Sequence, residues 1–213
     1  MKILVTGFEP FGGESVNPAQ QILEALPQQI GGAEIIKQVV PCVFDESIKV
    51  IHQAMQKHHP DAVVCLGQAG GRKSITPERV AINLSDARIP DNAGQQPIDL
   101  PIMPAGENAY FSTLPIKAIA DALRRENIPC EVSNTAGTYV CNHVMYGVLY
   151  WISKEFPQMR GGFIHVPFTE EQVKNKPDVA SLPLSEMIRG IQKAVETVAC
   201  VKQDLHTAEG REH

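Results

Sequence analysis

The sequence predicts an α/β fold, a three-layer α/β/α sandwich around a twisted sheet that is mixed but mostly parallel. Short apolar runs bounded by Gly, Pro or Asp are typical of strands buried on both faces of such a sheet. These runs lie at residues 2–6, 35–40, 62–66 and 162–166. Stretches with helical spacing separate them, so strand and helix alternate. A chain of 213 residues can bury a sizeable core, and we expect residues 1–200 to form a single domain.

The helices are predicted from their starting residues and from their apolar stripes. The first spans residues 18–26, with Asn17 as N-cap and Pro18 at the first helical position. The second spans residues 46–57 and follows Asp45. Further elements are predicted at 116–125 (helix), 130–132 (strand), 139–156 (helix) and 184–199 (helix).

Three segments depart from this alternation. Residues 78–84 alternate like a strand and follow the 62–66 strand through a loop too short for a crossover helix, so we expect an antiparallel strand. Residues 85–115 form a long, proline-rich irregular excursion, and such loops are usually functional or flexible. Residues 201–213 are polar and unpatterned, so we expect a disordered tail.

Composition argues against several classes of protein. The chain has 19 Lys and Arg against 24 Asp and Glu, and the basic residues are scattered, so we expect no nucleic-acid partner. No apolar run approaches the roughly 20 residues of a membrane helix, and the N-terminus lacks an export signal, so we expect no membrane partner. Five cysteines without a Cys-x-x-Cys pair fit reduced thiols in a cytoplasmic protein.

Cys141 is the most informative of the five cysteines. A glycine turn and Thr138, a possible N-cap, lead directly into the long helix, which places Cys141 in its first turn. Free backbone N–H groups and the helix dipole there would lower the thiol pKa below about 8.5 and could form an oxyanion hole. The alternative is a small, buried apolar residue. The other cysteines are most simply structural: Cys42, Cys65, Cys130 and Cys200.

A thiolate nucleophile needs a base that can also protonate a leaving amine, and histidine suits both tasks. His165 ends the 162–166 strand at the sheet edge where the helix carrying Cys141 begins, whereas His143 should point elsewhere on that helix. A carboxylate should orient the imidazole. Because an antiparallel strand starts at this same edge, Glu78 is a candidate, and its alternative is an exposed strand-entry residue. Three carboxylates on the following loop compete with it: Asp86, Asp91 and Asp99.

Ligand-binding motifs are sparse. The glycine-rich residues 7–13 follow the first strand but lack dinucleotide-binding spacing, and no phosphate-binding Gly-Lys-Ser/Thr occurs. Phe8 and Phe11 in this loop would form an apolar pocket wall, or would pin the loop to the core. A metal site is the rival for Cys141, but Cys-x-His stands without a second ligand pair, so we expect no metal.

Five separated motifs resemble those of pyroglutamyl peptidase type I, also called pyrrolidone carboxyl peptidase. They occur in the order of that family, and the similarity spans residues 1 to about 200. The motifs are residues 7–13 with Asn17 and Pro18, 66–70, 78–83 followed by 86–94, 133–142, and 163–168.

The resemblance implies an α/β/α cysteine peptidase that removes N-terminal pyroglutamyl residues from peptides and needs no cofactor. It assigns the catalytic triad to Cys141, His165 and Glu78. It implies that Phe8 and Phe11 hold the pyrrolidone ring, that backbone near Gln68 contacts the lactam and that Arg88 lies near the oxyanion site. It also implies a homo-oligomer, often a tetramer.

Two other classes of function remain open at this stage. An α/β enzyme resembling the nucleoside phosphorylases would share the layered fold, but it would need a phosphate site and would not need Cys141. A binding module would use the aromatic pocket to hold a ligand without turnover.

Overall fold

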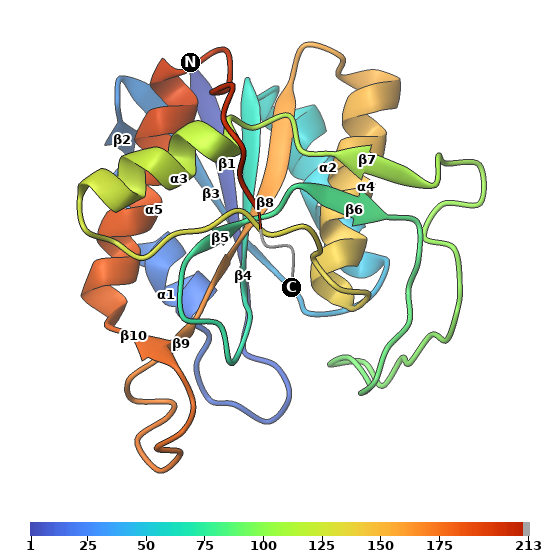
Figure 1. The fold of residues 1–213 in the computed structure, drawn as a ribbon. Coiled ribbons are helices and arrows are strands. Elements are labelled where there is room, and N and C mark those ends of the chain that lie inside the picture. The colour runs from blue at the N-terminus through green and yellow to red at the C-terminus, as the bar shows by residue number, and fades with distance from the viewer. Residues whose placement is uncertain (211–213) are drawn as a thin grey trace.

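The computed structural model describes residues 1–210 and shows helices on both faces of a twisted central sheet (Figure 1). Within this range the sheet has six strands in the order β2-β3-β1-β4-β8-β5. Neighbouring strands β3, β1, β4 and β8 are all parallel, and only the short edge strands β2 and β5 are antiparallel. The strands span Lys2–Phe8 (β1), Gln29–Ile30 (β2), Ala33–Val40 (β3), Ala62–Gln68 (β4), Thr76–Pro77 (β5) and Arg160–Val166 (β8). The predicted α/β class with a mixed, mostly parallel sheet is confirmed.

The two faces of the sheet bury two separate apolar clusters. Ile3 and Val5 of β1 belong to one cluster and Leu4 to the other, as the alternation of side chains along a strand requires. One face carries α1 (Pro18–Ala25), α3 (Ile116–Arg125) and α5 (Leu184–Cys200), and the opposite face carries α2 (Glu46–His58) and α4 (Val140–Glu155). No helix among residues 1–210 combines the length and the apolar character that crossing a membrane requires.

Most predicted elements are found within a few residues of their expected bounds. The helix at 116–125 matches α3, and the Asn17 side chain caps α1 by accepting a hydrogen bond from the Ala19 N–H at 2.9 Å. Asp45, by contrast, makes no side-chain cap on α2 and has a φ of 58°. Its carboxylate lies 3.4 Å from Nε2 of His143 instead, and its backbone N–H donates to that same nitrogen at 3.0 Å.

The prediction of a continuous strand over residues 78–84 beside β4 is wrong. β4 already lies between β1 and β8, so β5 pairs with β8, and the Glu78 N–H continues that ladder by donating to the Phe163 carbonyl at 2.9 Å. The chain then leaves the sheet, and β6 (Val80–Ile82) pairs with β7 (Ala109–Phe111) in a separate ribbon. The predicted strand at 130–132 is reduced to single bridges between neighbouring segments, and β9 (Phe168–Thr169) pairs with β10 (Ser181–Leu182).

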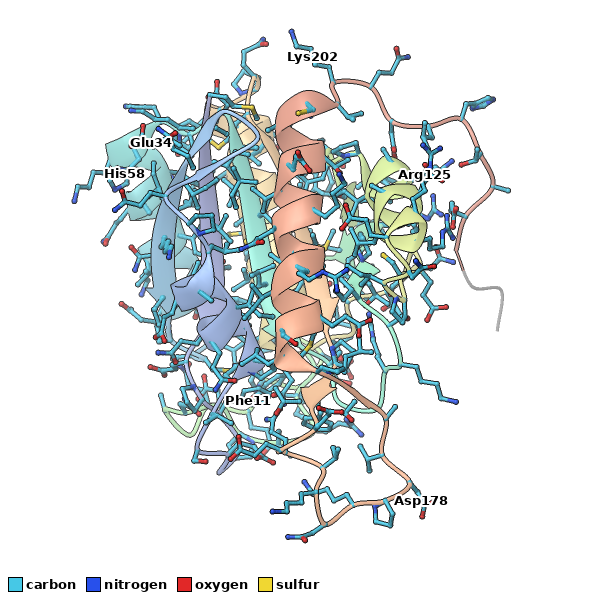
Figure 2. All side chains as sticks on the ribbon, turned by 90° about the vertical axis from the view of Figure 1, so that its left-hand side faces the viewer. Phe11, Glu34, His58, Arg125, Asp178 and Lys202 are labelled. Carbon is cyan, nitrogen blue, oxygen red and sulfur yellow. The ribbon has the colours of Figure 1, made fainter. Side chains whose placement is uncertain are left out.

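The expectation of a disordered tail does not hold for residues 201–210, which run from Lys202 past Arg125 along α3 (Figure 2). The Asp204 carboxylate accepts hydrogen bonds from the N–H groups of Lys117 and Ala118, at 3.1 and 2.9 Å. These are orphan donors of the first turn of α3, which has no side-chain cap of its own. Glu209 forms an ion pair with Arg124. Residues 211–213 lie outside the described residues.

Candidate active site

The carboxyl ends of β4 and β8 and the start of α4 bring Cys141 and His165 to one place. Gly67 of β4 is in register with His165 of β8, so the two residues face the same side of the sheet. Cys141 is the second residue of α4, and its Sγ would lie 3.1 Å from a Cβ placed on Gly67. The missing side chain at Gly67 therefore leaves space for the sulfur on the face of the sheet to which His165 also points.

The start of α4 is held by contacts to segments far away in the sequence. The buried Asn142 amide donates to the carbonyls of Ile82 and Leu84 and accepts from the Ile82 N–H, all between 2.9 and 3.0 Å. Thr138 and Asp86 exchange two further hydrogen bonds. These contacts fix the position of Cys141, and Asn142 is a supporting residue that the sequence analysis did not single out. The sequence feature that could have indicated Asn142 is an amide side chain directly after the candidate nucleophile, Cys141.

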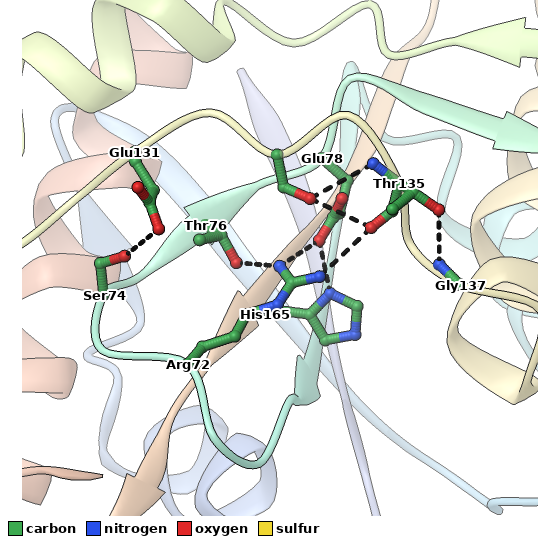
Figure 3. Close-up of polar contacts among 9 residues, drawn as sticks. Arg72, Ser74, Thr76, Glu78, Glu131, Thr135, Gly137 and His165 are labelled. Atoms are coloured by element: carbon green, nitrogen blue, oxygen red, sulfur yellow. Dashed lines mark hydrogen bonds and ion pairs between the residues drawn. The ribbon is translucent and has the colours of Figure 1, made fainter. Parts of the chain in front are cut away.

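Glu78 and His165 form a buried hydrogen-bonded pair (Figure 3). Nδ1 of His165 lies 2.7 Å from Oε1 of Glu78, and Glu78 has no exposed surface. Because a carboxylate only accepts hydrogen bonds, Nδ1 must carry the proton. Nε2 of His165 is then the unprotonated nitrogen and can act as a base.

Arg72, which the sequence analysis missed, completes this cluster. Its Nη1 lies 2.5 Å from Oε1 of Glu78, and its Nη2 donates to the Thr135 carbonyl at 3.2 Å. It also donates to Thr76. An arginine directly after the Gly70–Gly71 turn, six residues before Glu78, was the available signal.

Burial and charge set the protonation states of the three groups. Burial alone would raise the pKa of Glu78, but its hydrogen bond to His165 and the charges of His165 and Arg72 bring it below the usual value. Burial lowers the pKa of His165, and Glu78 opposes this effect. Burial, together with the neighbouring acidic groups Cys42 and Glu78, raises the pKa of Cys141 well above 9.0.

The predicted lowering of the Cys141 pKa by the helix start is therefore wrong. Burial of the thiol is the largest effect, and it outweighs the positive charge of Arg72, which lowers this pKa. At neutral pH the pair consists of a thiol and an uncharged imidazole. Burial also raises the pKa of Cys42, Cys65 and Cys130 to about 12, in line with a structural role, and Cys200 is exposed at the end of α5.

Two of the competing candidates, Asp91 and His143, have other partners. The Asp91 carboxylate accepts hydrogen bonds from the N–H groups of Phe44, Ala93 and Gln95. His143 accepts from the Asp45 N–H through Nε2, so its Nδ1 must donate to Ser85 Oγ, 2.9 Å away. Ser85 is thus a hydrogen-bond acceptor in this pair and is not activated as a nucleophile.

The predicted substrate-binding residues are distributed unevenly around Cys141, His165 and Glu78. Phe8 is buried with its ring centroid 6.3 Å from that of Phe163, whose ring lies 4.7 Å from the His165 ring. Phe11 lies 6.3 Å from Tyr139, an aromatic residue at the N-cap of α4 that the sequence analysis did not assign. Tyr139 adds a second aromatic ring beside Phe11 at the helix start.

Gln68 and Arg88 differ from each other in their surroundings. Gln68 ends β4, and its side-chain oxygen accepts from Gln172 at 2.8 Å, so that side chain already has a protein partner. Arg88 is exposed on the loop after β6, and no hydrogen bond or ion pair within residues 1–210 joins it to Glu78 or His165. The guanidinium that contacts Glu78 belongs to Arg72. The residues described here also contain no group of three His, Cys, Asp or Glu side chains suited to a metal ion.

Comparison with known proteins gives the family of this chain. A family model described as pyroglutamyl peptidase matches residues 1–201. The chain belongs to the pyroglutamyl peptidase family. Members of this family are cysteine-type hydrolases.

Individual relatives agree over the whole chain. The pyrrolidone-carboxylate peptidase of Streptococcus suis is 53% identical and that of Clostridium botulinum 52% identical, with at least 99% of both chains covered in each case. The crystal structure of pyroglutamyl peptidase I from Bacillus amyloliquefaciens superimposes with a TM-score of 0.95 at 48% identity, covering 97% of this chain and 99% of that one. A mutant pyrrolidone carboxyl peptidase from Pyrococcus furiosus gives a TM-score of 0.90 at 41% identity, covering 93% and 98%.

Proposed function

We propose that this protein hydrolyses the bond after an N-terminal pyroglutamyl residue of peptides. Cys141 is the nucleophile, His165 the general acid and base, and Glu78 the carboxylate that orients His165. The observation that carries these roles is the buried hydrogen bond between Nδ1 of His165 and Glu78, which leaves Nε2 free on the side of the sheet where Sγ of Cys141 lies. Membership of the pyroglutamyl peptidase family supports the substrate.

The reaction begins from an uncharged thiol and imidazole. His165 removes the thiol proton through Nε2 while Sγ attacks the pyroglutamyl carbonyl carbon, and Glu78 stabilises the imidazolium that forms. Backbone N–H groups at the start of α4 hold the developing oxyanion. His165 then protonates the departing amine, which leaves a thioester on Cys141. A water molecule, activated by His165, hydrolyses that thioester and releases pyroglutamate.

The site's chemistry also accounts for selectivity. A pyroglutamyl terminus is flat and has no ammonium group, so aromatic walls formed by Phe8, Phe11 and Tyr139 accept it without burying an unpaired charge. Backbone groups near Gln68 form hydrogen bonds with the polar groups of the lactam. A free N-terminal amine would bring a charge for which this pocket has no partner. Arg88 stays a proposed residue of the oxyanion side, which requires its exposed side chain to turn towards the bound carbonyl.

Release of a fluorescent amine from a pyroglutamyl amide, under reducing conditions, tests this proposal. We expect activity in the wild type, none in Cys141→Ala, and wild-type activity in Cys200→Ala, a control at an exposed cysteine. Circular dichroism establishes that each variant is folded. Equal turnover of alanyl or leucyl amides would contradict the selectivity argument.

A folded, reduced wild-type protein that released no amine would contradict the proposed function. Assays for nucleoside phosphorolysis, and for pyroglutamate binding after alkylation of Cys141, then separate the two other classes. Size measurement by light scattering tests the tetramer that the resemblance implies.

A further inference from the structure

Arg72 is a charged residue that the proposed reaction does not use, although it touches the triad directly. Its guanidinium contacts three residues in two separate segments: Thr76 and Glu78 in and just after β5, and the Thr135 carbonyl in the segment that leads to Cys141 (Figure 3). The Arg72 side chain comes from the turn after β4. Strand β4 contains Gly67, the residue that lies next to the sulfur of Cys141. One planar group therefore links the orienting carboxylate to the segment that delivers the nucleophile.

The contact is unlike an exposed ion pair. The Glu78 side chain is fully buried, whereas the Arg72 side chain is 26% exposed. Arg72 and His165 use the same oxygen, Oε1, at 2.5 and 2.7 Å. A carboxylate buried in this way needs a permanent positive partner to stay ionised while His165 is neutral, and arginine supplies it because its guanidinium stays charged.

The Arg72 charge acts on all three members of the triad. It lowers the pKa of Glu78, of His165 and of Cys141. The charge of Arg72 acts on both Glu78 and His165, which also act on each other. The groups whose charges act on Cys141 are Cys42, Glu78, Arg72 and Cys65.

We infer that Arg72 is a positioning residue for the proposed reaction: it holds Glu78 ionised and in place against His165, and ties this pair to the segment before Cys141. The inference rests on the proposed roles of Glu78 and His165. Arg72 reaches the reacting atoms only through these residues, so its loss should change turnover and its pH dependence more than substrate binding.

The test compares pH profiles of kcat and KM for three variants. Arg72→Gln removes the charge, and Arg72→Lys keeps it but cannot contact Thr76, Glu78 and Thr135 together. Arg79→Gln is the matched control, because Arg79 also binds the 133–135 segment through Asn134, at 2.8 Å, but does not contact Glu78.

For Arg72→Gln we expect kcat to fall by about tenfold to a hundredfold with little change in KM, because a hydrogen bond to a charged, buried group is lost. Both limbs of the kcat/KM profile should move to higher pH, by about one unit, because removing a positive charge makes every triad group harder to deprotonate. Arg72→Lys should lower kcat severalfold, and both limbs of its kcat/KM profile should lie near the pH values of the wild type. Arg79→Gln should keep both kcat and the profile.

Arg72→Gln with unmoved limbs, or with no greater loss than Arg79→Gln, would overturn the inference. If Arg72→Gln does not fold, Arg72→Lys decides, since wild-type kcat in that variant would also overturn it. The Glu78→Gln variant separates the proposed role of Glu78 from that of Arg72: wild-type activity in Glu78→Gln would contradict both. If Glu78→Gln is impaired, adding Arg72→Gln should cost little more, and a fully multiplicative further loss would overturn the inference alone.

Discussion

Gly67 offers a direct test of how closely Cys141 is fitted to the sheet. In Gly67→Ala the new Cβ would lie 2.6 Å from Cζ of Phe163 and 3.1 Å from Sγ of Cys141. The Phe163 ring is rigid and only 1% exposed, so both the ring and the sulfur must shift. Overpacking of this kind costs about 1–3 kcal/mol, which for a domain of this size lowers Tm by roughly 2–12 °C.

The effect on activity should exceed the effect on stability. Even a displacement of a few tenths of an ångström moves the nucleophile out of line, and we expect kcat to fall by about tenfold or more. The pyroglutamyl amide assay measures kcat, and thermal unfolding measures Tm. Gly161→Ala is the control, because its Cβ would meet Ile152 Cδ1 at 2.4 Å in the same layer but at the opposite end of β8. If Gly67→Ala and Gly161→Ala lost the same amount of Tm and kept the same kcat, the proposed effect of Gly67 on the position of Cys141 would be refuted.

Two further predictions concern the tail and pH. Asp204→Ala removes the acceptor for the first turn of α3 and should cost about 1 kcal/mol, or roughly 2–4 °C in Tm, with kcat unchanged; an unchanged Tm would show that the tail does not cap the helix. The acidic limb of kcat/KM should lie below pH 6.5, because His165 must be neutral to accept the thiol proton and its pKa is lowered. The free energy of unfolding should fall as pH drops below about 6.5 and again below about 4.5, because the unfolded chain then binds protons that the folded His165 and Glu78 do not. A free energy of unfolding, measured in urea, that is as large at pH 5 as at pH 7 would contradict this.

Local signals were reliable where neighbours in sequence decide the structure. Asn17 caps α1 through the N–H of Ala19, two residues away, and the apolar runs became the parallel strands because burial on both faces needs little more than their composition. Cys141 also lies in the first turn of α4 as predicted, but Thr138 is not the N-cap: the cap residue is Tyr139, which makes no side-chain cap, and Thr138 Oγ1 donates to the Asp86 carbonyl. The motifs that resemble the family implied the proposed triad as a set.

The prediction for Glu78 rested on an antiparallel strand, and its outcome is instructive. The strand that leads to Glu78 is antiparallel as predicted, but it pairs with β8 and not with β4. Glu78 still reaches His165, because β8, the strand against which β5 lies, itself carries His165.

The sequence by itself determined the layered α/β class, the helix that presents Cys141 and the strand that ends in His165. These depend on local periodicity, on caps and on motifs. Only the tertiary structure decided that Arg72 completes the Glu78–His165 pair, that Asp45 donates to His143 in place of capping α2, and that the tail caps α3. Each of these is a contact between side chains or backbone groups that are distant in the chain or on an irregular loop. The neutral state of the Cys141 thiol belongs with them, because it follows from burial, which exists only once the layers have packed.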